Sequence, residues 1–162
     1  MNVHLREDLK ELHIKKARIK DAIFIHSLIK KFAKDDEMLP RSLNEIYENI
    51  RDFFICEDKG EIIGASALHI LWENLAEIRS VAVSKEYQKK GIGKKFIERC
   101  LKEARVLGVE KVFALTYNPK FFKKFGFKDI DKNTLPQKIW GDCLKCPKFP
   151  ECEEVAVIKM LR

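Results

Sequence analysis

The chain has 162 residues, of which 46% are apolar and 35% charged, and its formal net charge is +7. This size predicts one domain over residues 1–162 that folds without disulfides, and the dispersed lysines suit small anionic partners or plain solubility better than a nucleic acid. No apolar run approaches the ~20 residues that a membrane span requires, and the charged N-terminus does not resemble a signal peptide. Five cysteines, an odd number, do not suggest a secreted disulfide framework. We therefore expect a cytoplasmic protein without membrane contact.

The first half of the chain predicts two helices between strands. Residues 1–14 form an N-terminal arm or short helix, and a strand follows around Lys15 to Ile19. Asp21 is expected to cap a helix with apolar residues at helical spacing: Ile25, Leu28, Ile29 and Phe32. Ser42 and Glu45 form a capping-box signature before a second helix, with these residues on one face: Leu43, Ile46, Tyr47 and Ile50.

The second half alternates strands and helices. A hairpin turns at Glu57 to Gly60, and residues 76–84 form the next strand. A helix ended by Gly108 carries these apolar residues: Ile97, Cys100, Leu101, Ala104 and Leu107. Then come a strand at 111–116, a short helix at 119–125, a strand at 126–130 and, within a C-terminal segment at 131–162, a closing strand at 153–161. This order predicts an α/β (α+β) fold, with a mixed sheet and helices on both faces.

A loop rich in glycine and lysine joins the strand at 76–84 to the long helix. The first backbone N–H groups of a helix lack partners and lie at the positive end of its dipole, so they bind phosphate oxygens where the backbone is accessible. Gly91 and Gly93 have no Cβ to block that approach, and nearby charge comes from Lys89, Lys90, Lys94 and Lys95. The loop therefore suits a diphosphate, and an ordinary surface turn is the alternative.

The sequence Gln88-Lys-Lys-Gly91-Ile-Gly93 resembles the Q/R-x-x-G-x-G/A motif of the GNAT acetyltransferase superfamily. The segment FFKKFGF, from Phe121 to Phe127, is similar to the later signature of that superfamily. The resemblance implies an N-acetyltransferase that uses acetyl-CoA. It also implies a GNAT-type sheet that is mixed, mostly antiparallel, and contains a splayed strand pair.

The resemblance carries a set of donor-binding residues with it. The backbone of Val81, Ala82 and Val83 would hydrogen-bond the pantetheine arm as an added strand, although these residues could instead form an ordinary core strand. The amides from Lys89 to Lys94 would hold the diphosphate. The full expected set is Val81, Ala82, Val83, Gln88, Lys89, Lys90, Gly91, Ile92, Gly93, Lys94, Asn118, Phe121 and Phe122.

Two groups are candidates for the chemistry. Glu77 lies where many GNAT members carry a carboxylate and could be the general base, or it could simply pair with Arg79. Strand alternation predicts that Glu77, Arg79, Val81 and Val83 share one face. The backbone N–H of Val81 is the expected oxyanion donor.

The general acid has no clear candidate in the sequence. Many relatives have tyrosine at the position of Phe122, which has no proton to give. Tyr117 could replace it or could only pack, so the acid stays unassigned. His26 and His69 are interpreted as structural or surface residues.

One subgroup of GNAT proteins is more similar still. The segments LPRS, EIIGASALHILWENLAEIRSVAV and FALT followed by FFKKFGF resemble the short, single-domain N-acetylglutamate synthases of arginine biosynthesis. This implies acetylation of the α-amine of glutamate or a related amino acid. Arg41 and Arg79 are the expected carboxylate anchors, unless Arg41 is a solvated loop charge. A protein or peptide N-acetyltransferase and a non-catalytic acyl-CoA sensor are the alternative functions. The protein could also form a homodimer.

The cysteine-containing tail has no clear role. Cys143, Cys146 and Cys152 give three thiols, whereas a zinc site normally takes four ligands, so we expect no metal. Three interpretations of these cysteines remain: a zinc site completed by another ligand, a disulfide, or free thiols in a packed loop.

Overall fold

The computed structural model describes residues 12–135 and 154–161. Within them the strands are β1 (Ile14–Lys16), β2 (Phe53–Asp58), β3 (Glu61–Trp72), β4 (Leu75–Val83), β5 (Lys111–Thr116), β6 (Lys128–Ile130) and β7 (Val155–Met160). The helices are α2 (Ala22–Lys34), α3 (Leu43–Glu48), α4 (Ile92–Leu107) and α5 (Pro119–Lys123). Short 3-10 turns lie at η1 (Ile19–Asp21), η2 (Ile50–Asp52), η3 (Lys85–Tyr87) and η4 (Lys132–Thr134). This order of helices and strands is the predicted one.

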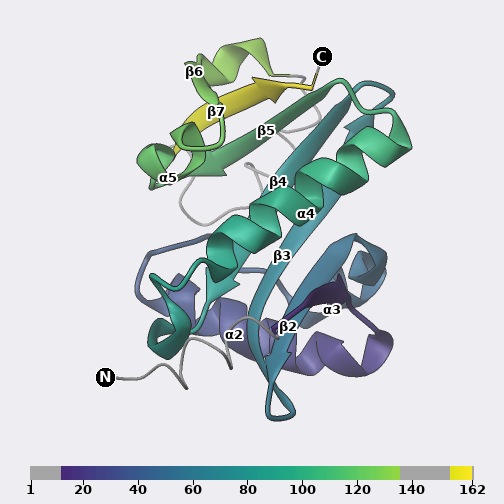
Figure 1. The fold of residues 1–162 in the computed structure, drawn as a ribbon, viewed down its shortest axis with the longest axis vertical. Helices are drawn as coiled ribbons and strands as arrows, with labels where there is room; N and C mark the ends of the chain where they lie inside the picture. The colour runs from purple at the N-terminus through teal and green to yellow at the C-terminus, as the bar shows by residue number, and fades with distance from the viewer. Residues whose placement is uncertain (1–11, 136–153, 162) are drawn as a thin grey trace.

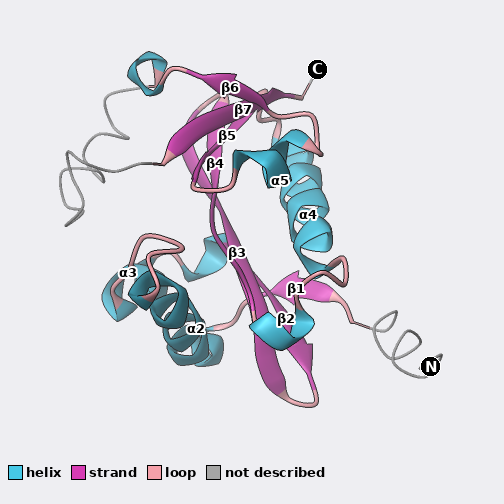
Figure 2. Cartoon of the chain, turned by 90° about the vertical axis from the view of Figure 1, so that its left-hand side faces the viewer, coloured by secondary structure: helices cyan, strands magenta, loops and turns pink. Residues whose placement is uncertain are grey.

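The strands form one sheet in the order β1-β2-β3-β4-β5-β7-β6 (Figure 1). All neighbouring strands in it are antiparallel except β4 and β5, which are parallel. Figure 2 shows α2 and α3 on one face and α4 and α5 on the other. The expected mixed, mostly antiparallel sheet with helices on both faces is therefore confirmed.

Each face of the sheet has its own apolar core. Against α4, the core contains Phe54, Phe96, Ile97 and Val112, all fully buried. Against α2 and α3, it contains Ile25, Ile29, Ile46 and Ile55. Burying one such side chain contributes roughly 1.5–3 kcal/mol. These two layers fix the sheet between the helices and leave the end of β4 available for a site.

The structure corrects four details of the sequence prediction. The first strand ends at Lys16, before the turn η1. The carboxylate of Asp21 accepts a hydrogen bond from the Arg18 backbone at 2.7 Å and does not cap α2. Tyr47 is 39% exposed because the six-residue α3 buries only a narrow stripe. Leu107 is 56% exposed, since the chain turns at the following glycine and the next residue, Val109, enters the core.

The capping box predicted for α3 is confirmed. The Ser42 hydroxyl accepts a hydrogen bond from the Glu45 backbone N–H at 3.1 Å. This cap fixes the point at which the loop after α2 enters α3. The same loop carries Arg41, so the cap also helps to place a candidate site residue.

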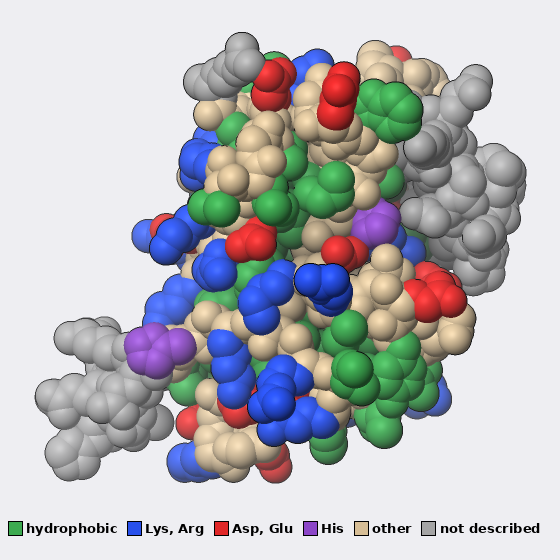
Figure 3. All heavy atoms as spheres, turned by 90° about the vertical axis from the view of Figure 1, so that its right-hand side faces the viewer, with side chains coloured by type: hydrophobic (Ala, Val, Ile, Leu, Met, Phe, Trp, Pro, Cys, Tyr) green, Lys and Arg blue, Asp and Glu red, His purple; other side chains and the backbone are tan. Residues whose placement is uncertain are grey.

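Charges of both signs lie on the face that Figure 3 shows. Figure 3 shows Lys and Arg side chains gathered across the middle of the face opposite to that of Figure 2, with Asp and Glu scattered around them. In the portion that the structure describes, no helix combines the length and apolar character needed to cross a bilayer. The cysteines Cys143, Cys146 and Cys152, and residues 1–11 of the expected arm, lie outside the described residues.

Candidate active site

The site begins where β4 and β5 separate. The two strands pair only from Leu75 to Glu77 and from Lys111 to Phe113. Beyond that point the rest of β4 has no strand neighbour on its β5 side within the described residues. This is the splayed pair that the sequence led us to expect, and Glu77 lies at its apex. Backbone groups on such an edge can accept an extended ligand as an added strand.

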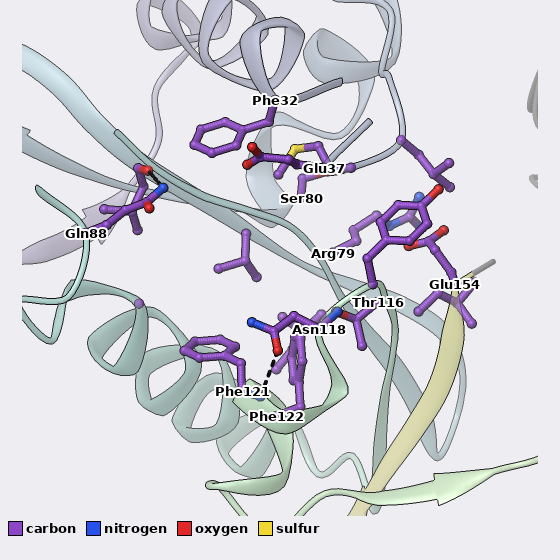
Figure 4. Close-up of a pocket in the computed structure, with 18 of the residues that line it drawn as sticks. Phe32, Glu37, Arg79, Ser80, Gln88, Thr116, Asn118, Phe121, Phe122 and Glu154 are labelled. Atoms are coloured by element: carbon purple, nitrogen blue, oxygen red, sulfur yellow. Dashed lines mark hydrogen bonds between the residues drawn. The ribbon is translucent and has the colours of Figure 1, made fainter. Parts of the chain in front are cut away.

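A large cleft of about 1510 Å³ occupies the split (Figure 4). It brings together most of the predicted site residues, which are Arg41, Glu77, Arg79, Val81, Val83, Gln88, Lys89, Gly91, Gly93, Lys94, Asn118, Phe121 and Phe122. In Figure 4, Gln88 lies at one end of the cleft, whereas Arg79 and Glu154 lie at the other. The phosphate-binding and acceptor-binding groups that we predicted are thus at opposite ends.

Three predicted donor residues do not line the cleft with their side chains. Ala82 is buried in the core facing α2, and Ile92 is buried in the core beneath α4. Lys90 extends over the ring of Tyr87, with 5.6 Å from Nζ to the ring centroid. For Ala82 and Ile92, only backbone contact with a ligand is consistent with this placement.

The glycine loop has the geometry expected of a phosphate site. Gly91 is the N-cap of α4 with φ +86°, and a Cβ placed on it would meet no atom of the described residues within 4 Å. The N–H groups of the first helical turn that follows have no partner within the helix. Gly93 has a second reason to be glycine, because a Cβ there would approach Phe121 Cζ to 3.2 Å. A phosphate could therefore reach the helix N-terminus closely.

Gln88 has a structural role that the sequence did not indicate. Its side-chain amide donates a hydrogen bond to the Val83 carbonyl at 2.9 Å. This contact ties the loop back to the end of β4. The loop amides and the strand edge are thus held in a fixed relation to one another.

A bulge in β4 changes which side chains face the acceptor end. Ser80 has φ +57°, and Ser80 with Val81 occupies the space opposite one residue of β3. As a result Val81 and Val83 pack against the α4 core, and the predicted single face shared with Glu77 and Arg79 is wrong. An extra residue reverses the strand alternation, so the two pairs lie on opposite faces.

Glu77 and Arg79 form a buried ion pair. Arg79 Nε lies 3.3 Å from Glu77 Oε1, and the side chains are only 13% and 8% exposed respectively. The pair anticipated as an alternative for Glu77 is therefore present, but it is not solvated. Both residues also line the cleft, so the pairing places a carboxylate and a guanidinium at the apex of the split.

Arg41 is largely buried, contrary to the solvated alternative. Its side chain is 17% exposed, and its Nη1 lies 3.5 Å from Glu45 Oε2, the limit of a hydrogen bond. Its Nε is buried and has no hydrogen-bond partner among the residues described. A buried donor without a partner is costly, so this atom is well suited to an anionic ligand in the cleft.

Sequence reasoning missed several residues in the cleft wall. Glu37 comes from the loop after α2, Ser80 from the bulge, and Glu154 from the residue before β7. Glu154 is 7% exposed. No motif surrounds any of these positions, and only the folding of distant segments brings them together. Tyr117 and Phe122 both line the cleft. Phe122 is largely buried there, with its ring centroid 5.4 Å from that of Phe121.

The profile of the acetyltransferase (GNAT) family matches residues 20–127. The chain belongs to this family. An uncharacterized N-acetyltransferase of Chlorobaculum tepidum is 44% identical to this GNAT protein over 148 residues, or 91% of this chain and 96% of the relative. An amino-acid acetyltransferase of Mycobacterium tuberculosis is 33% identical over 132 residues, or 80% of this chain and 75% of the relative.

The fold of this GNAT protein agrees with that of a solved N-acetylglutamate synthase from Neisseria gonorrhoeae. The TM-score is 0.85 at 25% identity, over 93% of this chain and 35% of the synthase, whose structure contains coenzyme A and N-acetyl-glutamate. This chain thus spans about a third of that synthase. As a GNAT enzyme it is an N-acetyltransferase that takes the acetyl group from acetyl-CoA.

Gly91→Val is expected to weaken acetyl-CoA binding at least tenfold, as measured by calorimetry. A loss of ~1.4 kcal/mol of binding free energy corresponds to a tenfold loss of affinity. The added side chain would fill the open space at the helix N-terminus. Gly60→Val is the matched control, since Gly60 also has positive φ and open surroundings but lies outside the cleft. Equal affinity of the Gly91 variant and wild type would contradict the placement.

Proposed function

We propose that this enzyme acetylates the α-amino group of glutamate or of a closely related amino acid. The observation that carries the proposal is the buried Nε of Arg41, which lines the cleft and has no hydrogen-bond partner among the described residues. Arginine binds carboxylates bidentately and is suited to partly buried anion sites. Arg79, in the same cleft wall, supplies a second guanidinium.

The comparisons support an amino-acid acceptor. A relative of similar length is named an amino-acid acetyltransferase, and the synthase with the same fold was solved with N-acetyl-glutamate. If glutamate is the acceptor here, the enzyme serves arginine biosynthesis. A cytoplasmic location, expected from the sequence, stays a prediction.

We assign the general-base role to Glu77. An amine with a pKa of about 8 or above is mostly protonated at neutral pH and must lose a proton before it attacks. Glu77 is buried at the apex of the split, where the acyl carbon would lie if the pantetheine arm follows the edge of β4. The backbone N–H of Val81 remains the proposed oxyanion donor.

We assign no general acid. Phe122 has no hydroxyl group, and it is buried among other aromatic rings. Tyr117 lines the cleft and is the nearest replacement in the sequence. Because a thiolate is a good leaving group, the reaction does not require a dedicated acid in this position.

The proposal is tested by thiol release from acetyl-CoA in the presence of free amino acids and of peptides with free N-termini. We expect glutamate or glutamine to be the best acceptor, with acetyl-CoA alone as the background. Reaction with peptides while all free amino acids are inert would replace the proposal with a peptide N-acetyltransferase. Binding of acetyl-CoA without turnover of any acceptor would favour a non-catalytic sensor.

A further inference from the structure

His69 lies directly across the sheet from the proposed base. In the antiparallel pairing of β3 with β4, His69 is opposite Glu77, and Ala67 is opposite Arg79. Directly opposite residues point to the same face, with Cβ atoms about 4.5–5.5 Å apart. Ala67 packs into the core facing α2 and α3, so His69, Glu77 and Arg79 share that face.

Asp52 fixes the imidazole of His69. Its Oδ2 lies 2.6 Å from His69 Nδ1, which is a short hydrogen bond from the turn η2 to the strand β3. The side chains of His69 and Asp52 are 27% and 25% exposed, whereas that of Glu77 is 8% exposed. The pair therefore lies between a buried carboxylate and solvent.

A small cavity with both polar and apolar walls lies between the cleft and Asp52. Its volume is about 20 Å³, and its walls include Asp52 together with four residues that also line the cleft, namely Arg41, Glu45, Arg79 and Ser80. A space of roughly 10–15 Å³ is enough for one water molecule where polar groups surround it. The cavity thus offers room for a water between the acceptor end of the cleft and Asp52.

We propose that His69, oriented by Asp52, passes the proton of the acceptor from Glu77 to solvent. This inference rests on the proposed role of Glu77 as base. One N–H bond of the acceptor ammonium breaks as Glu77 takes the proton, and the free amine then attacks the acyl carbon. The C–N bond forms, the C–S bond breaks, and the second proton lost by nitrogen protonates the departing thiolate to give the thiol of coenzyme A. Glu77 returns to its carboxylate by giving the proton to His69 Nε2, and the imidazolium releases it to water. The single proton produced in each turnover is accounted for.

The surroundings suit this transfer. Histidine is the side chain whose charge ordinarily changes between about pH 5 and 8. Among the described residues, Asp52 contacts His69 and Glu77 lies opposite it on β4. Arg79 is two residues from Glu77 on the same face, and Arg41 and Glu45 line the small cavity beside Asp52. The hydrogen bond of Asp52 to Nδ1 holds the ring, so Nε2 is the nitrogen that can exchange a proton with Glu77. In this proposal His69 takes the proton from Glu77 and acts on the reaction only through that residue.

The test is the pH dependence of kcat for His69→Gln and Asp52→Asn, measured with the best acceptor of the amino-acid and peptide panel. We expect kcat at neutral pH to fall roughly tenfold in dilute buffer, less than the ~10²-fold effect of losing a direct base. Concentrated imidazole buffer should restore most of the loss, and KM for the acceptor should stay unchanged. His26→Gln, a half-buried histidine of α2 outside the cleft, is the matched control.

A double variant separates this inference from the proposed base. In the Glu77→Gln background, His69→Gln should cause no further loss of kcat, because the amide at position 77 takes no proton that it could pass to His69. If Glu77→Gln alone leaves kcat unchanged, the base assignment fails. If Glu77→Gln is impaired but the two losses multiply, or if imidazole does not rescue His69→Gln, the base stands and the relay is wrong. Thermal unfolding of each variant identifies losses due to misfolding.

Discussion

Glu77→Gln is expected to lower kcat by about 10²-fold at neutral pH, the usual scale for loss of a general base. The amide has nearly the same shape as the carboxylate but cannot take a proton from the acceptor. The deficit should shrink as pH rises, because a growing fraction of the amine is then neutral without help. The measurement is kcat over a pH range from neutral to alkaline with saturating acetyl-CoA.

The pH profile decides what the Glu77 result means. Glu77 also forms a buried ion pair with Arg79, so its replacement changes the surroundings of that guanidinium. A loss that is the same at every pH would assign Glu77 a structural role in positioning Arg79. Glu73→Gln is the control, since this exposed residue lies outside the cleft in the turn between β3 and β4.

Arg41→Ala is expected to raise KM for the amino acid far more than KM for acetyl-CoA. Leaving a desolvated carboxylate without its partner costs on the order of 2–4 kcal/mol, or about 30-fold to nearly 10³-fold in binding. The buried Nε of Arg41, which has no hydrogen-bond partner within the described part of the chain, is the donor that this carboxylate would lose. Initial rates with each substrate varied in turn separate the two constants.

Two comparisons sharpen the Arg41 experiment. Arg51→Ala removes an exposed arginine outside the cleft and should change neither constant. Glutamate and glutamine should differ little if only the α-carboxylate is bound by arginine, and strongly if both carboxylates are. Equal increases in KM for the amino acid and for acetyl-CoA would show that Arg41 supports the cleft as a whole and does not bind the acceptor.

Local patterns in the sequence determined the helices and strands and the glycine-rich loop that is expected to bind acetyl-CoA. The periodic spacing of Ile25, Leu28, Ile29 and Phe32 predicted α2, because side chains three and four residues apart lie on one helical face. The position of Gly91 between a strand and a helix pointed to a phosphate site, because helix geometry alone leaves the first amides unpaired. These features depend on residues close together in the chain, so they can be recognised without the fold.

Only the tertiary structure decided the arrangement of the acceptor end. The bulge at Ser80 places Val81 on the face opposite Glu77, and a single added residue in a strand leaves no reliable mark in its apolar pattern. The position of His69 opposite Glu77 depends on strand register, and that of Glu154 in the cleft depends on where a distant segment returns to the sheet. Such contacts are set by packing between segments far apart in sequence, which local periodicity does not encode.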